Sequence, residues 1–285
     1  MHSGDTQARP NWRAIVTFYV LACALSWPFF WWRDVHTGSW KAFPLPEEIK
    51  DLTWGPAVAA LLVFWIMPAT RRWAVSFFGP SWRRSAVFFV APILFAFIGY
   101  RIHSGAFSYN LLYYLMIGGV STLGEELGWR GFLQGSLRPL GRVRGYLLLA
   151  LMWEAWHFTS HLKGTLTEVV SRMSIYIPLV VAVTFLLGFV VERTDSLLLA
   201  VTLHEWLDIA VDSGGTYLMW AALACIPLWL WLIWTWPDRA SVHICTSGPL
   251  RRSEGARCPA FAMISTRRAQ GSRKWLLTAT VWPPR

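Results

Sequence analysis

Long apolar runs follow one another through the first 236 residues of the chain, and short polar segments separate them. Each run approaches the roughly 20 residues that a helix needs to cross the hydrocarbon core of a bilayer. The runs lack the alternation of apolar and polar residues that is typical of a membrane β-barrel. The pattern predicts eight helical spans, at roughly 12–32, 52–68, 85–103, 108–128, 145–161, 169–191, 196–211 and 217–236.

The composition favours the same fold class. Hydrophobic residues make up 55% of the 285 residues and charged residues only 15%, whereas about a quarter of the residues in a soluble domain are charged. The four Cys residues form no C-x-x-C motif, so we expect no Cys-based metal or redox site. We expect an all-α, polytopic transmembrane helical bundle of about eight spans. The composition argues against an ordinary soluble enzyme, a disordered chain and a disulfide scaffold.

The positive charge of the chain is concentrated after residue 236. The formal net charge is +10, and residues 237–285 contain nine Lys or Arg residues against two acidic ones. This segment shows no sustained periodicity, so we expect a poorly ordered basic C-terminal tail beside a membrane-spanning domain at 1–236. A tail that faces an anionic membrane surface explains the charge more simply than nucleic acid does, and we expect no nucleic-acid partner.

Arginine pairs between the second and third expected spans set the predicted orientation. Arg71, Arg72, Arg83 and Arg84 lie in this loop, and loops rich in Lys and Arg stay on the cytoplasmic side. With this loop inside, inner segments hold 19 of the 26 Lys and Arg residues and outer segments hold 6. The sequence therefore predicts a multi-pass integral membrane protein whose two termini are cytoplasmic.

Ionisable residues interrupt three of the expected spans. The fourth span ends in Gly-Glu125-Glu126-Leu-Gly-Trp-Arg130, the fifth contains Trp-Glu-Ala-Trp-His157, and the seventh contains His204-Glu-Trp-Leu-Asp208. Because charge at the centre of a bilayer is costly, such residues indicate function. Glu125, His157 and His204 lie 8 to 10 residues from the expected cytoplasmic ends of their spans, which is about 12–15 Å at the rise of an α-helix. Equal depth in three helices predicts one shared buried site.

The spacing within each motif indicates which side chains share a helix face. Glu126 and Arg130 are four residues apart and can form an ion pair, while Glu125 points about 100° away from Glu126. His204 and Asp208 are also four residues apart. Two kinds of chemistry fit these groups. One is a catalytic divalent metal, zinc in the first place, held by Glu125, His157, His204 and Asp208; the other is a glutamate base whose histidine and polar partners stabilise an oxyanion.

The three motifs resemble those of the CPBP family of intramembrane endopeptidases, which comprises CAAX proteases and bacteriocin-processing enzymes. The resemblance rests on E-E-x-x-x-R, aromatic-x-x-x-H and H-x-x-x-D in this order, and it covers a motif-bearing core at 85–211. It implies a helical membrane protease that cuts near the cytoplasmic bilayer surface and takes a lipidated or amphipathic peptide or protein.

The resemblance also implies roles for the motif residues. Glu125 and His157 would activate water, His204 and Asp208 would stabilise the oxyanion or bind a metal, and Glu126 with Arg130 would hold the geometry of the site. Two positions depart from the usual pattern. Trp153 stands where Phe is usual, a change expected to affect packing only, and Asp208 stands where Asn is commonest. Because an ionised Asp cannot donate a hydrogen bond to an oxyanion, Asp208 favours the metal alternative slightly.

Other interpretations of the same residues stay open at this point. Glu154 and His161 lie one turn on either side of His157 and are either ligands or polar packing between helices. His204-Glu205-x-x-Asp208 also resembles a zincin motif in which Glu205 would be the base. A catalytically inactive membrane binding or immunity protein and a proton or solute transporter are the alternative functions.

Overall fold

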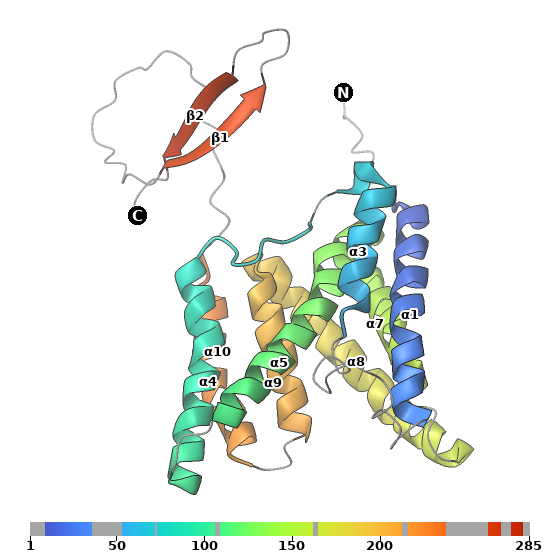
Figure 1. Cartoon of the computed structure of the whole chain (residues 1–285), viewed down its shortest axis with the longest axis vertical. Coiled ribbons are helices and arrows are strands. Elements are labelled where there is room, and N and C mark those ends of the chain that lie inside the picture. The colour runs from blue at the N-terminus through green and yellow to red at the C-terminus, as the bar shows by residue number, and fades with distance from the viewer. Residues whose placement is uncertain are drawn as a thin grey trace. The chain divides into compact units, whose positions relative to one another are not determined.

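The computed structural model describes residues 9–35, 53–71, 73–105, 109–161, 165–212, 216–237, 262–268 and 275–281. The chain divides into two compact units, Met1–Ala240 and Ser241–Arg285. The described part of the first unit is a bundle of helices, and the described part of the second is a pair of strands (Figure 1).

Within the residues that the structure describes, eight long helices lie where the apolar pattern predicts them. They are α1 (Trp12–Val35), α3 (Gly55–Ile66), α4 (Trp82–Ser104), α5 (Tyr109–Glu126), α7 (Arg142–His161), α8 (Leu166–Thr194), α9 (Leu197–Asp212) and α10 (Tyr217–Trp234). Short helical segments connect some of them: η2 (Pro68–Thr70), the π-helix η3 (Leu127–Leu133), α6 (Gln134–Leu137) and η4 (Arg138–Leu140). The predicted all-α bundle is confirmed.

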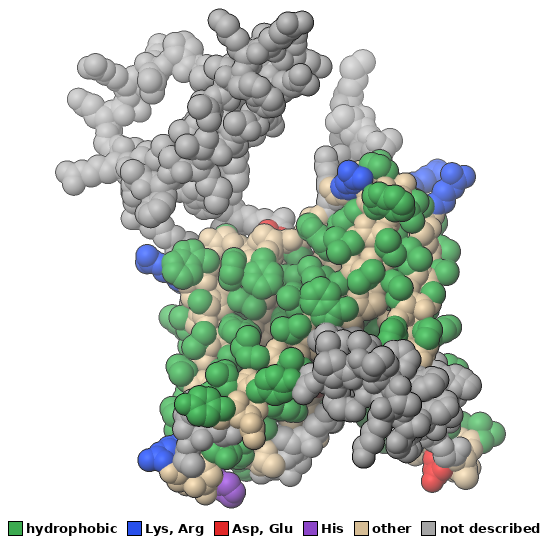
Figure 2. Space-filling view, viewed as in Figure 1, with side chains coloured by type: hydrophobic (Ala, Val, Ile, Leu, Met, Phe, Trp, Pro, Cys, Tyr) green, Lys and Arg blue, Asp and Glu red, His purple; other side chains and the backbone are tan. Residues whose placement is uncertain are grey.

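Four helices among the described residues are long and apolar enough to cross a membrane: α1 over Trp12–Phe30, α4, α8 and α10. The motif residues lie in α5, in the π-helix η3, in α7 and in α9, and Glu125, Glu126 and His204 among them are buried. The face of the bundle in Figure 2 is covered mainly by hydrophobic side chains, and Lys and Arg side chains lie near its ends. An outer surface this apolar is typical of a protein surrounded by lipid. The protein is therefore an integral membrane protein, as the sequence predicts.

Helices pack in pairs that are often distant in sequence. α1 packs against α3, α4 against α10, α7 against α8, and α5 against α9, and α5 crosses the middle of the bundle in Figure 1. Aromatic side chains fill the core where α1 meets the segment after α5. The ring of Phe18 makes an edge contact with Trp129 at 5.5 Å and lies 4.9 Å from Phe132. Such contacts fix the segment that follows the two glutamates.

The second unit contains the strands β1 (Ala262–Arg268) and β2 (Trp275–Val281), which pair antiparallel with Ser265 opposite Thr278. Both segments contain β-branched residues, which favour extended structure. The rest of residues 238–285 lies outside the described residues. The predicted poor order of the tail as a whole therefore stays a prediction, with two strands found within it.

Candidate active site

Four of the predicted site residues line one cavity between α5, α7, α8 and α9. This cavity has a volume of about 190 Å³ and is bordered by Glu125 at the end of α5, His157 in α7, and His204 and Asp208 in α9. Glu154 of α7 lines it as well. The fourth wall is mainly apolar and comes from α8, through Tyr176, Leu179, Val180 and Val183. The sequence thus predicted the convergence of the three motifs correctly.

Two glycines position the end of α5. Gly124 and Gly128 stand on either side of the glutamate pair, and both face the start of α3. A Cβ atom on Gly124 would lie 2.7 Å from Cδ1 of Trp54, and one on Gly128 would lie 2.3 Å from Cβ of Pro56. Only glycine allows this close approach of backbones. The approach fixes the direction in which Glu125 and Glu126 point.

The helix changes type directly after the glutamates. The apolar pattern predicts a continuous α-helical span to about residue 128, but residues Leu127–Leu133 form a π-helix. A π-turn takes one more residue than an α-turn, so it rotates the following side chains, and such segments occur frequently at functional sites. Trp129 and Arg130, both in this segment, are fully buried. The local sequence carries no signal that predicts this change.

Glu126 joins two of the motifs. Its Oε1 atom lies 2.8 Å from NH1 of Arg130, as the i, i+4 spacing predicts, and the same oxygen lies 2.8 Å from Nδ1 of His204. The side chains of Glu126 and Arg130 have no exposed surface. Because the oxygen also accepts from Arg130, we assign the ring proton of His204 to Nδ1, which then donates to Glu126. The contact between Glu126 and His204 was not predicted, since it depends on how α5 and α9 face each other.

Asp208 lies at the other ring nitrogen of His204. Its Oδ2 atom is 3.5 Å from Nε2, too far for a good hydrogen bond, and the two groups form an ion pair only when the ring carries a second proton. The Asp208 side chain is 64% exposed, whereas that of His204 is 6% exposed. His204 is therefore held between two carboxylates, one deeply buried and one open to the cavity.

Trp153 does more than the sequence analysis expected of it. Its indole N–H donates a hydrogen bond to Oε2 of Glu125 at 3.1 Å. The guanidinium carbon of Arg130 lies 4.3 Å from the centre of the Trp153 ring, and His204 packs edge-on against that ring at 5.0 Å. The expectation that Trp in place of Phe affects packing only is wrong, because the indole supplies a donor that Phe lacks.

Aromatic side chains pack against His157 of α7, and a second acid of this helix lines the same cavity. The His157 ring lines the cavity and packs against Trp153 at 5.7 Å and against Trp156 at 4.7 Å between ring centroids. Glu154 is buried, with 5% of its surface exposed, and belongs to the cavity. The side chain of His161 lies outside the described residues.

Glu205 does not contribute to this cavity. It is buried at 4% exposure, and its carboxylate lies against the backbone of α5, where a Cβ atom on Gly118 or Gly119 would meet its oxygens at 2.9 and 3.0 Å. The zincin-like interpretation needs Glu205 beside His204 in the reaction site. The orientation of α9 gives that interpretation no support.

The side chains do not form a metal centre as they stand. Among the described residues, no group of three or more His, Cys, Asp and Glu side chains is arranged to hold a metal ion. Both ring nitrogens of His204 face carboxylates, and one oxygen of Glu125 is bonded to Trp153. The predicted set of Glu125, His157, His204 and Asp208 therefore does not fit a metal in this arrangement.

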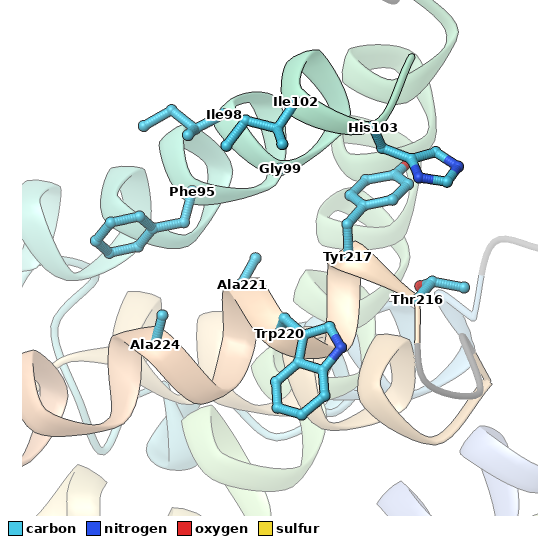
Figure 3. A pocket seen from close by; sticks show the side chains of 10 residues that line it. All are labelled: Phe95, Ile98, Gly99, Ile102, His103, Thr216, Tyr217, Trp220, Ala221 and Ala224. Carbon is cyan, nitrogen blue, oxygen red and sulfur yellow. The ribbon is translucent and has the colours of Figure 1, made fainter.

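A larger hollow lies between α4 and α10, away from the motifs. Its volume is about 760 Å³, and Figure 3 shows the side chains that line it. Phe95, Ile98 and Ala224 lie toward one end, and His103, Thr216 and Tyr217 toward the other. None of the predicted site residues borders this hollow. It does not combine acids with imidazoles and is not the candidate active site.

Acids and imidazoles on three helices of a membrane bundle gather around one small cavity. Residues 106–210 match the family model described as type II CAAX prenyl endopeptidase Rce1-like. The matched segment contains all three motifs and covers over a third of the chain, and it confirms the resemblance to the CPBP endopeptidases. No match was found among curated proteins or solved structures.

Proposed function

We propose that the protein is an intramembrane endopeptidase that hydrolyses a peptide bond near the cytoplasmic face of the membrane. The observation that carries this proposal is that a carboxylate and an imidazole, each held by neighbouring side chains, line one cavity. Trp153 orients the Glu125 carboxylate, and two carboxylates hold the His204 imidazole. A binding protein needs neither a positioned base nor a positioned charge-stabilising ring. The family match to CAAX prenyl endopeptidases supports the same function.

Glu125 is the proposed general base. Oε2 accepts the hydrogen bond from Trp153, and the carboxylate has further lone pairs that can accept a proton from water in the cavity. His157 lines the same cavity and would orient this water. As the water oxygen attacks the peptide carbonyl carbon, its proton passes to Glu125, and the carbonyl oxygen becomes an oxyanion. Glu125 then returns the proton to the leaving amine when the C–N bond breaks.

His204 and Asp208 are the proposed partners of the oxyanion. Because Nδ1–H donates to Glu126, a ring that also carries a proton at Nε2 can donate that N–H to the oxyanion. Asp208 at 3.5 Å from Nε2 would balance the positive charge of the ring. This removes the difficulty that an ionised Asp cannot itself donate to an oxyanion, because the imidazole donates in its place. No step in this mechanism passes through a metal.

Glu126 and Arg130 are proposed as positioning residues. Their ion pair is fully buried, and it holds Glu126 where it meets His204. The ring of Trp153 lies against Arg130, so the same pair supports the residue that orients Glu125. Neither Glu126 nor Arg130 lines the cavity. Their effect on the reaction passes through His204 and Trp153.

The proposed substrate is a lipidated or amphipathic peptide or protein that reaches the cavity from the cytoplasmic leaflet. The apolar wall from α8 can contact the buried part of such a peptide, and the acids and imidazoles face the bond to be cut. In the proposed topology both termini are cytoplasmic.

The test is proteolysis by the purified protein in liposomes. Glu125→Gln keeps the size of the side chain but removes the base, and we expect a loss of about 10³-fold in kcat/KM. Glu192→Gln is the matched control, because Glu192 pairs with Arg142 outside the cavity. Equal activity of Glu125→Gln and wild type would end the proposal.

Two further results would select the alternative functions. Full biological activity of Glu125→Ala together with His204→Ala would favour a binding or immunity protein. A pH-dependent flux across the liposome membrane without proteolysis would favour a transporter.

A further inference from the structure

Glu205 of α9 is a buried acid that the proposed reaction does not use. It is 4% exposed and is not among the residues that line the motif cavity. Within the described part of the chain, its Oε1 atom has no hydrogen-bond partner. A buried polar atom without a partner is costly, whereas a leucine of similar size would fill the same space without that cost. A carboxyl group at this position is therefore not explained by packing alone.

Two consecutive glycines of α5 form the surface against which Glu205 lies. A Cβ atom on Gly118 would lie 2.9 Å from Oε1 of Glu205, and one on Gly119 would lie 3.0 Å from Oε2. A methyl group at either position would displace the carboxyl group, so the absence of side chains at Gly118 and Gly119 creates a notch that the carboxyl group fills. The carboxylate also reaches the backbone of Gly119. The polar end of Glu205 thus contacts α5 at its backbone.

The residue before Glu205 makes a second contact between the same two helices. Nδ1 of His204 lies 2.8 Å from Oε1 of Glu126, at the end of α5. Gly119 and Glu126 are seven residues apart, so they lie on one face of α5, about 10 Å apart along its axis. The adjacent side chains of His204 and Glu205 therefore reach separate points of α5. Contacts at two points restrict the rotation and the sliding of α9 against α5 more than one contact does.

This arrangement connects Glu205 to the proposed reaction. His204 is the proposed donor to the oxyanion, and Asp208 follows it by one turn of α9. Glu125, the proposed base, belongs to α5. A shift of α9 against α5 would therefore move the donor relative to the base, and a misplacement of about 1 Å can lower a catalytic rate about 100-fold.

We propose that Glu205 is a positioning residue of the candidate active site. Its carboxyl group fills the glycine notch of α5 and holds α9 where the His204 ring meets Glu126 and borders the cavity. Glu205 touches neither substrate nor reacting atoms, and its effect on the reaction passes through His204. The inference rests on the proposed endopeptidase function and adds to it a residue that acts from outside the cavity.

The first experiment measures kcat and KM of the full-length protein in liposomes, together with thermal unfolding of each variant in detergent. Glu205→Leu keeps the size of the side chain but removes its polar end. We expect kcat to fall about tenfold with KM within about twofold of wild type, because the donor moves relative to the base. We expect its unfolding temperature to equal or exceed that of wild type, because a buried carboxyl group has been removed. A purely structural role predicts instead that activity follows stability.

A conservative variant tests whether the polar end is what matters. Glu205→Gln keeps the length of the side chain and a polar group that can contact the backbone of α5. We expect it to retain most of the kcat that Glu205→Leu loses. Glu192→Leu is the control for removal of a carboxyl group, because Glu192 pairs with Arg142 outside the cavity, and we expect it to leave kcat unchanged.

Substitution in the notch gives an independent test. Gly118→Ala places a methyl group 2.9 Å from Oε1 of Glu205, so we expect kcat to fall several-fold. In Glu205→Ala the methyl group meets no carboxyl group, so the added Gly118→Ala is expected to lower kcat no further. Such non-additivity identifies the contact itself. Gly99→Ala of α4, whose Cβ atom would meet Tyr217 at 3.2 Å, is the matched control and is expected to leave kcat unchanged.

The inference and the function on which it rests fail in different ways. A wild-type kcat in Glu205→Leu, equal losses in Glu205→Leu and Glu205→Gln, or additive effects of Gly118→Ala and Glu205→Ala would each overturn the inference and leave the endopeptidase function intact. Failure of the wild-type protein to cleave any peptide would overturn both.

Discussion

Two hollows of the bundle differ in size and in lining, and the smaller of them contains the motif residues. The hollow between α4 and α10 has about four times the volume of the motif cavity, 760 Å³ against 190 Å³. Its lining is largely apolar, with His103 and Thr216 among the polar exceptions. The motif cavity combines three carboxyl groups with two imidazoles. Volume alone does not locate a membrane active site, whereas convergence of ionisable groups from separate helices does.

The hollows also differ in how firmly their polar groups are held. In the motif cavity, His204 and Glu125 each have a hydrogen-bond partner at 2.8 and 3.1 Å. In the hollow between α4 and α10, the His103 ring stacks on Tyr217 at a centroid distance of 6.2 Å. Catalysis requires groups that are fixed before the reaction begins. The comparison therefore separates a prearranged site from a surface depression.

The largest effect is expected from the buried ion pair that supports the motif cavity. Arg130→Leu leaves the Glu126 carboxylate buried with only His204 as partner, and breaking such a pair costs about 3–5 kcal/mol. Thermal unfolding in detergent measures this loss of stability. Arg142→Leu breaks a pair of nearly the same length at the surface, 2.7 Å from Glu192, and is expected to cost about 1 kcal/mol or less. Similar losses in both variants would contradict the special importance of the buried pair.

The next effect concerns the donor that Trp153 supplies. Trp153→Phe keeps a ring against Arg130 but removes the hydrogen bond to Glu125, and we expect kcat to fall about tenfold with little change in KM. Peptide cleavage kinetics in liposomes give both values. An unchanged kcat would mean that the indole N–H does not orient the base, and that the original packing interpretation is sufficient.

A substitution at a close backbone contact near the site is expected to lower stability less than Arg130→Leu does. Gly128→Ala places a Cβ atom 2.3 Å from Cβ of Pro56 and 2.6 Å from its backbone carbon, so overpacking is expected to cost about 1–3 kcal/mol. Gly99→Ala, in the hollow between α4 and α10, meets Tyr217 at 3.2 Å and is expected to cost less. Unfolding temperatures of the two variants give the comparison. Equal or reversed losses would show that α3 adapts to the added methyl group.

The smallest effect is expected from substitutions in the larger hollow. Ile98→Ala and Trp220→Ala change its lining, and neither residue belongs to the lining of the motif cavity. We expect proteolysis to stay within about twofold of wild type, as for most substitutions distant from a site. A loss comparable to that of Trp153→Phe would show that this hollow takes part in the reaction.

The sequence by itself determined the helices and which of them carry the polar residues that line one cavity. Membrane-spanning runs and i, i+4 spacing are local properties, because a helix satisfies its backbone hydrogen bonds within one segment. For this reason the eight helices, the pair of Glu126 with Arg130, and the shared cavity of Glu125, His157, His204 and Asp208 were all predictable.

Tertiary structure alone decided which atoms of these residues meet. The contacts of Glu126 with His204 and of Trp153 with Glu125 depend on the rotation of α5, α7 and α9 about their axes. That rotation is set by the close approach at Gly128 and by the π-helix that follows the glutamates. Packing between helices couples residues far apart in the chain, and no local pattern encodes it. The cavity position of Glu154 became visible only when the helices were assembled.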